Sequence, residues 1–124
     1  MARVYYNKLV RDRIKEKIEG KGEHCKVREV TDDAEFQQEL CKKVIEESYG
    51  VAHARTRTEF LQEYADLMVV LDALTSQLEI SEADISVAIS ENVEKKGLYA
   101  SRHFLHWSED KDYVSDETPQ GIKE

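Results

Sequence analysis

The sequence predicts an all-α fold: an antiparallel helical bundle of about four helices with short extended segments, which associates with further copies of itself. Charged residues make up 35% of the 124 residues and aromatic residues 8%, a composition typical of a soluble helical protein. Proline occurs once and glycine five times, too few for a turn-rich β-sandwich. Three helix-start signals also precede apolar residues at helical spacing.

We expect one helical domain over residues 1–107, followed by an acidic, mobile tail over residues 108–124 that is nearly free of large apolar residues. The first helix is expected at about residues 6–19, and Gly20 and Gly22 should end it. The segment 24–30 alternates loosely between apolar and polar residues, which predicts an extended piece. The apolar positions of the first helix are Leu9, Val10, Ile14 and Ile18.

A second helix is expected to begin at Asp32, which can cap it, while Glu35 can return a bond to the backbone of the cap. This helix should run to about residue 54, weakened near its end by Gly50. Its predicted apolar stripe comprises Phe36, Leu40, Val44, Ser48 and Val51.

Residues 56–59 form another capping box. The helix that follows is apolar on nearly every side between residues 64 and 74, except at Asp66 and Asp72, so we expect it to be buried all round, in the bundle or at a subunit interface. For Asp72 this predicts a buried ion pair or an interface contact.

A third cap signal at residues 81–84 opens the last helix. Lys95 and Lys96 suit its C-terminus, and Gly97 should end it. The mixed segment 98–107 that follows is expected to be extended.

The net charge of −8 excludes a nucleic-acid polymer as partner, because most of the surface would repel it.

No apolar run approaches the roughly 20 residues needed to span a bilayer, and the start lacks the apolar segment of a secretory signal. Cys25 and Cys41 fit no metal-ligand spacing, which indicates free thiols in a reducing compartment. The expected location is the cytoplasm, without a membrane partner.

Four acids, Glu46, Glu47, Glu63 and Asp66, fall on two consecutive predicted helices. Glu47 lies at the edge of the apolar stripe, and Glu63 and Asp66 are one helical turn apart. A short loop makes the helices antiparallel, so Glu47 could face Glu63 and Asp66.

Acids withdrawn from water need a cation, and converging acids usually hold a divalent metal. The pattern predicts a site for Mg²⁺, with Mn²⁺ as an alternative, and chemistry on a phosphate compound. A solvated or salt-bridged face is the alternative, and for Glu46 both interpretations stay open.

Two further stretches sharpen this interpretation. The opening segment 6–14 (YNKLVRDRI) resembles that of MazG-like, phosphoribosyl-ATP pyrophosphohydrolase-like proteins, which are all-α nucleoside triphosphate pyrophosphohydrolases. The family's metal motifs resemble segments 43–47 (KVIEE) and 63–67 (EYADL), and its closing segment resembles 96–99 (KGLY). The similarity covers about residues 5–104, in the expected order.

The resemblance implies a homodimer or homotetramer that uses Mg²⁺ to hydrolyse a nucleoside triphosphate, or a similar nucleotide, to the monophosphate and pyrophosphate. By position, the family's metal-site residues are matched by Glu46, Glu47, Glu63 and Asp66. Of these, Glu47, Glu63 and Asp66 are the expected metal ligands, and Glu46 and Glu47 the expected catalytic acids. The implied substrate-binding residues are Lys8, Arg11, Asn92, Lys95, Lys96 and Arg102.

The basic residues have simpler alternatives. Lys8 and Arg11 have the spacing of residues that form surface ion pairs on a helix, and this interpretation stands beside phosphate binding. Lys95 and Lys96 would equally complement a helix C-terminus.

One position departs from the family pattern. The family's first motif has a glutamate where this chain has Gly50. The loss of a ligand would weaken or shift the metal, which favours a relative that binds nucleotide or regulates a partner without turnover. A water molecule or a partner chain could also supply the missing ligand. On this missing-ligand interpretation, a glutamate at position 50 should strengthen magnesium binding. A third interpretation is a helical adaptor without a ligand, in which residues 64–74 form a protein interface.

Overall fold

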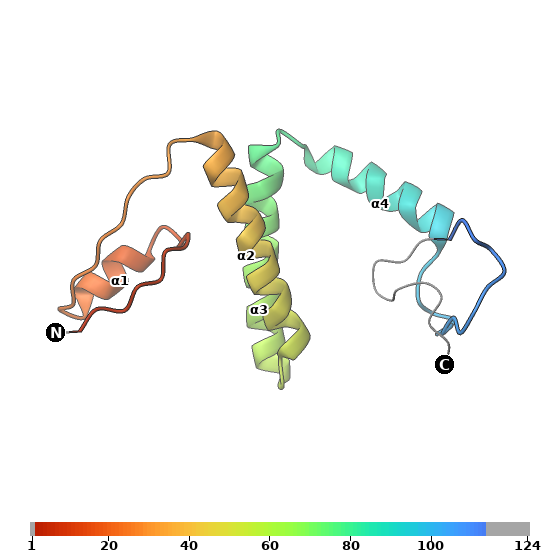
Figure 1. The fold of residues 1–124 in the computed structure, drawn as a ribbon, viewed down its shortest axis with the longest axis horizontal. Helices are drawn as coiled ribbons and strands as arrows, with labels where there is room; N and C mark the ends of the chain where they lie inside the picture. The colour runs from red at the N-terminus through yellow and green to blue at the C-terminus, as the bar shows by residue number, and fades with distance from the viewer. Residues whose placement is uncertain (1, 114–124) are drawn as a thin grey trace. The chain divides into compact units, whose positions relative to one another are not determined.

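The all-α prediction is confirmed by the computed structural model, which describes residues 2–113 (Figure 1). Within these residues there is no strand, and the predicted tail from residue 114 onward lies outside them. The chain divides after Ile85 into two units, which are described separately. The helices are α1 (Ile14–Gly20), α2 (Asp33–His53), α3 (Arg57–Gln77) and α4 (Glu82–Lys96).

The first unit is built on a hairpin of α2 and α3, which lie side by side in Figure 1 and pack against each other. Residues 54–56 connect the two helices, a length typical of antiparallel neighbours. Both predicted caps are confirmed. The Asp32 side chain accepts a hydrogen bond from the Glu35 amide at 3.0 Å, and Thr56 Oγ1 accepts one from the Glu59 amide at 3.1 Å.

The core of this hairpin is small. Among the residues that the structure describes, the buried hydrophobic side chains are Leu40 on α2 and Val70 on α3. The predicted α2 stripe is largely confirmed, although Ser48 is exposed. The prediction that α3 is buried all round is wrong for the single chain, since Tyr64 and Met68 are exposed. One neighbouring helix covers only one face of α3.

The predicted first helix is too long. Helix α1 begins only at Ile14, and residues 2–13 form no helix. Asn7 has a φ of 48°, in the left-handed region, which interrupts a right-handed helix. Leu9 and Val10 therefore belong to an irregular segment, and of the predicted apolar positions only Ile14 and Ile18 lie on a helix.

Helix α4 begins in a reciprocal capping box at the end of the first unit. The Asp84 amide donates to Ser81 Oγ at 3.1 Å, and the Ser81 amide donates to the Asp84 carboxylate at 3.3 Å. As predicted, Gly97 ends the helix, with a φ of 76° and its amide donating to the Val93 carbonyl. In the second unit, described residues 98–113 form no helix.

None of the helices in residues 2–113 combines the length and apolar character that crossing a membrane requires.

Replacing the α2 cap should destabilise the hairpin. We expect Asp32→Ala to lower the free energy of unfolding by about 1 kcal/mol, because the Glu35 amide loses its acceptor. Asp32→Asn keeps a side-chain oxygen and serves as the matched control. Urea denaturation followed by circular dichroism measures both, and equal losses would contradict the capping role.

Candidate metal centre

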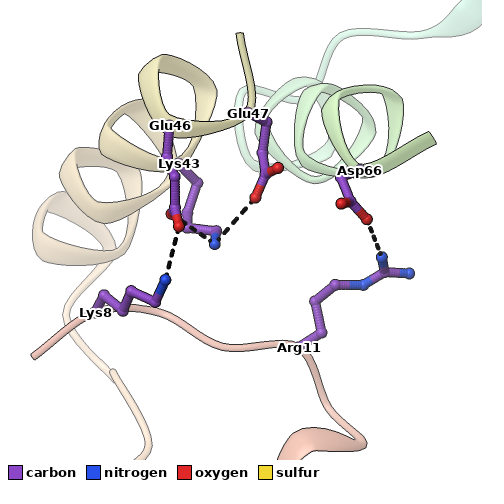
Figure 2. Close-up of polar contacts among 6 residues, drawn as sticks. All are labelled: Lys8, Arg11, Lys43, Glu46, Glu47 and Asp66. Atoms are coloured by element: carbon purple, nitrogen blue, oxygen red, sulfur yellow. Dashed lines mark hydrogen bonds and ion pairs between the residues drawn. The ribbon is translucent and has the colours of Figure 1, made fainter. Parts of the chain in front are cut away.

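Three acids converge between α2 and α3. Glu47 projects from α2, and Glu63 and Asp66 project from successive turns of α3. Each offers a carboxylate oxygen, and these oxygens all lie within 4.8 Å of one another. Figure 2 shows Glu47 and Asp66 extending from the two helices toward the same region. The predicted convergence of these acids, called the acidic triad below, is confirmed, and the ion itself stays a prediction.

The triad fits a small divalent cation. Magnesium takes oxygen ligands at 2.0–2.1 Å in an octahedron, so ligands on opposite sides of the ion lie about 4 Å apart. The triad oxygens lie within 4.8 Å of one another, so one ion could contact all three if the carboxylates adjusted their positions. All three donors are hard carboxylate oxygens, and all three residues are partly covered. The residues present could therefore hold Mg²⁺ or Mn²⁺ and leave further positions for water or phosphate oxygens.

Lys43, for which the sequence predicted no role, lies at the centre of this site. Lys43 Nζ lies 2.8 Å from Glu46 Oε2 and 3.2 Å from Glu47 Oε1 (Figure 2). Its side chain is only 17% exposed, and that of Glu47 only 15%. The signal was present in the sequence, because residues three and four apart on a helix are neighbours. Lys43 neutralises charge on a face of α2 that is packed against α3.

The same contacts shift the pKa values of two of these groups. Partial burial lowers the pKa of Lys43, but its hydrogen bonds to Glu46 and Glu47 outweigh this, and the net pKa is raised. The pKa of Glu46 is lowered, first by its hydrogen bond to Lys43 and then by its bond to Lys8. Both groups therefore stay charged at neutral pH.

The N-terminal segment brings two more cations to the acids. Lys8 Nζ lies 2.7 Å from Glu46 Oε1, and Arg11 Nη1 lies 3.3 Å from Asp66 Oδ1 (Figure 2). Both pairs are well exposed, so each contributes little to stability. Their value is positional, since they place the predicted phosphate-binding cations against a predicted catalytic acid, Glu46, and a predicted metal ligand, Asp66. Glu46 itself stands outside the triad, held by Lys8 and Lys43.

A hollow of about 580 Å³ adjoins this charged cluster within the first unit. Its lining includes the apolar residues Phe36, Leu40 and Val70 and the charged residues Lys43 and Asp66. The volume lies within the range of sites for small molecules. The wall combines apolar surface with a few charged groups, which is typical of such sites.

The remaining predicted substrate-binding residues lie in the second unit and are exposed, and their role stays a prediction. They are Asn92, Lys95, Lys96 and Arg102. On α3, Asp72 is exposed, so the expected buried ion pair is wrong for the single chain. Gly50 lies directly against the Glu63 side chain.

Removing Lys43 should destabilise the metal-free protein. Lys43→Met keeps the length of the side chain and leaves Glu46 and Glu47 without their shared donor, which should cost about 1–3 kcal/mol of unfolding free energy. Lys42→Met is the matched control, since Lys42 is 71% exposed and its pair with Glu39 is worth less than about 1 kcal/mol. Chemical denaturation in the presence of a chelator measures both variants. If both variants lost the same unfolding free energy, Lys43 would not stabilise the protein more than an exposed lysine does.

Comparisons with protein-family models, with curated proteins and with solved structures find no match to this chain.

Proposed function

We propose that this protein is a MazG-like enzyme that uses Mg²⁺ to hydrolyse a nucleoside triphosphate, or a similar nucleotide, to the monophosphate and pyrophosphate. The observation that carries the proposal is the convergence of Glu47, Glu63 and Asp66 between two packed helices. The motif resemblance in the opening and acidic segments supports the same reaction.

In this proposal Glu47, Glu63 and Asp66 hold the metal. Bound there, Mg²⁺ would offset negative charge on the phosphates and lower the pKa of a water molecule. Hydrolysis adds the water oxygen to a phosphorus atom and breaks the anhydride bond between the α- and β-phosphates. Pyrophosphate leaves, and a carboxylate takes the proton of the water.

Glu46 is the proposed base, and the ion pairs around it indicate how it would become available. Its Oε1 is held by Lys8 and its Oε2 by Lys43. A base needs an oxygen within hydrogen-bond reach of the water. If Lys8 moves to a substrate phosphate, Oε1 becomes free at the moment when substrate is present. Arg11 can likewise pass from Asp66 to a phosphate, which leaves Asp66 free for the metal.

The hollow beside the charged cluster supports a small substrate rather than a polymer. Apolar lining residues such as Phe36 and Leu40 suit a nucleobase or sugar, while the lining residues Arg11 and Lys43 could contact the phosphates. The motif resemblance alone proposes Asn92, Lys95, Lys96 and Arg102 as substrate-binding residues.

Self-association to a homodimer or homotetramer is part of the proposal. Exposed large apolar side chains on the hairpin include Ile45, Leu61, Tyr64 and Met68. A pair of helices with so few buried side chains has too little core to be stable alone. A second copy of the chain would cover these surfaces.

A nucleotide-binding protein without turnover is the second candidate, and Gly50 is the residue that favours it. Such a protein would gain thermal stability with nucleotide and release no product. The adaptor interpretation would show neither effect.

The enzyme should release pyrophosphate from at least one member of a panel of ribo- and deoxyribonucleoside triphosphates, and only with Mg²⁺ or Mn²⁺ present. Asp66→Asn removes the negative charge of a metal ligand and should reduce the rate by at least about 100-fold. Asp72→Asn, an exposed acid on the same helix, should retain the wild-type rate.

A wild-type protein that binds nucleotide but forms no pyrophosphate would favour the second candidate. Full activity in Asp66→Asn would contradict the metal site.

Analytical ultracentrifugation should find the wild-type protein as a dimer or tetramer. Met68→Glu places a charge on an exposed apolar face of α3 and should shift the protein toward monomer. Gln62→Glu, an exposed polar position on the same helix, should leave the oligomer intact. A monomeric wild-type protein at micromolar concentration would contradict the proposed assembly.

A further inference from the structure

Gly50 lies within helix α2, four residues beyond the first residue of its Glu46-Glu47 pair, at a point where α2 approaches α3. A glycine inside a helix is unfavourable relative to alanine, so its presence needs a compensating reason. A Cβ atom at position 50 would lie 2.8 Å from Glu63 Cδ and 3.4 Å from Glu63 Cγ, and closer still to Glu63 Oε2. Position 50 therefore provides the space that the Glu63 carboxylate occupies.

The other members of the acidic triad are held in a different way. Lys43 pairs with Glu47, and Arg11 pairs with Asp66. Among the described residues, no lysine or arginine forms an ion pair with Glu63. The position of the Glu63 carboxylate thus depends on the shape of the α2 surface rather than on a partner charge.

We propose that Gly50 is a positioning residue for the metal centre: the absence of a side chain there lets the Glu63 carboxylate lie against α2, within reach of Glu47 and Asp66. This inference rests on the proposed metal-dependent function. It replaces the interpretation in which Gly50 weakens the metal site by the loss of a glutamate ligand. Gly50 leaves room for the carboxylate of Glu63, which α3 supplies to the metal site. On this interpretation the site does not need a carboxylate at position 50 of α2.

A side chain at position 50 would act on the metal site while leaving the fold intact. The atoms that it would meet belong to the far end of the flexible Glu63 side chain, which can rotate away without moving either backbone. The carboxylate would then leave the triad. Because alanine favours the helical backbone more than glycine does, the thermal midpoint should stay equal or rise.

The test is a calorimetric titration of the full-length protein with Mg²⁺ alone, repeated with Mn²⁺. Gly50→Ala should weaken binding by about 10- to 100-fold, the effect typical of losing a group that orients a metal ligand. Gly20→Ala is the matched control, since a Cβ at position 20 meets nothing within 4 Å, and its affinity should equal that of the wild type. Circular dichroism and thermal unfolding of both variants check that the fold is retained.

A double-mutant cycle identifies the route of the effect. If Gly50 acts through Glu63, adding Gly50→Ala to Glu63→Gln should cause little further loss of metal affinity. Gly50→Glu should bind the metal no more tightly than the wild type. Unchanged affinity in Gly50→Ala, additive losses in the cycle, or tighter binding in Gly50→Glu would overturn the inference. A wild-type protein that binds neither ion would overturn the proposed metal centre itself, and the inference with it.

Discussion

The structure depends on charges placed where two helices pack. Glu47 and Lys43 are mostly covered, and a covered charge costs free energy unless an opposite charge meets it. Around the hairpin, Glu46 and the acidic triad supply four carboxylates, whereas only three cations, Lys8, Arg11 and Lys43, pair with members of this set, so the cluster keeps a net negative charge. A divalent ion would reverse the sign of this charge. The same residues would then attract a phosphate instead of repelling it, so metal binding would favour phosphate binding.

The features that bring the acidic triad together are local, and so the sequence predicted them. Capping residues at Asp32 and Thr56 set the starts of α2 and α3, and the short connection forces the helices to be antiparallel. With both starts and the connection known, helical geometry brings Glu47 opposite Glu63 and Asp66. The convergence of the triad follows from a few residues at each end of the hairpin.

The errors of the sequence-based predictions lie where structure depends on contacts between distant segments. Apolar spacing suggested a helix from residue 6, but spacing cannot reveal that Asn7 adopts a left-handed conformation. The contacts of Lys8 and Arg11 with acids on α2 and α3 also join segments far apart in the sequence. Gly50 is the clearest case, because its role depends on a side chain from another helix. A sequence pattern records that a carboxylate is absent from position 50, whereas the structure identifies what occupies the space.

Helix α3 carries its acids and its exposed apolar side chains on opposite faces. Glu63, Asp66 and Val70 follow the spacing of one face, on which Val70 is buried and the two acids are only partly covered. Leu61 and Met68 lie about half a turn away around the helix, and both are exposed. A second copy that covers these apolar side chains would therefore contact the face opposite the acids and leave the triad open to metal and substrate. The apolar character that made α3 resemble a fully buried helix is thus compatible with an accessible metal centre, because the two requirements involve different sides of the same helix.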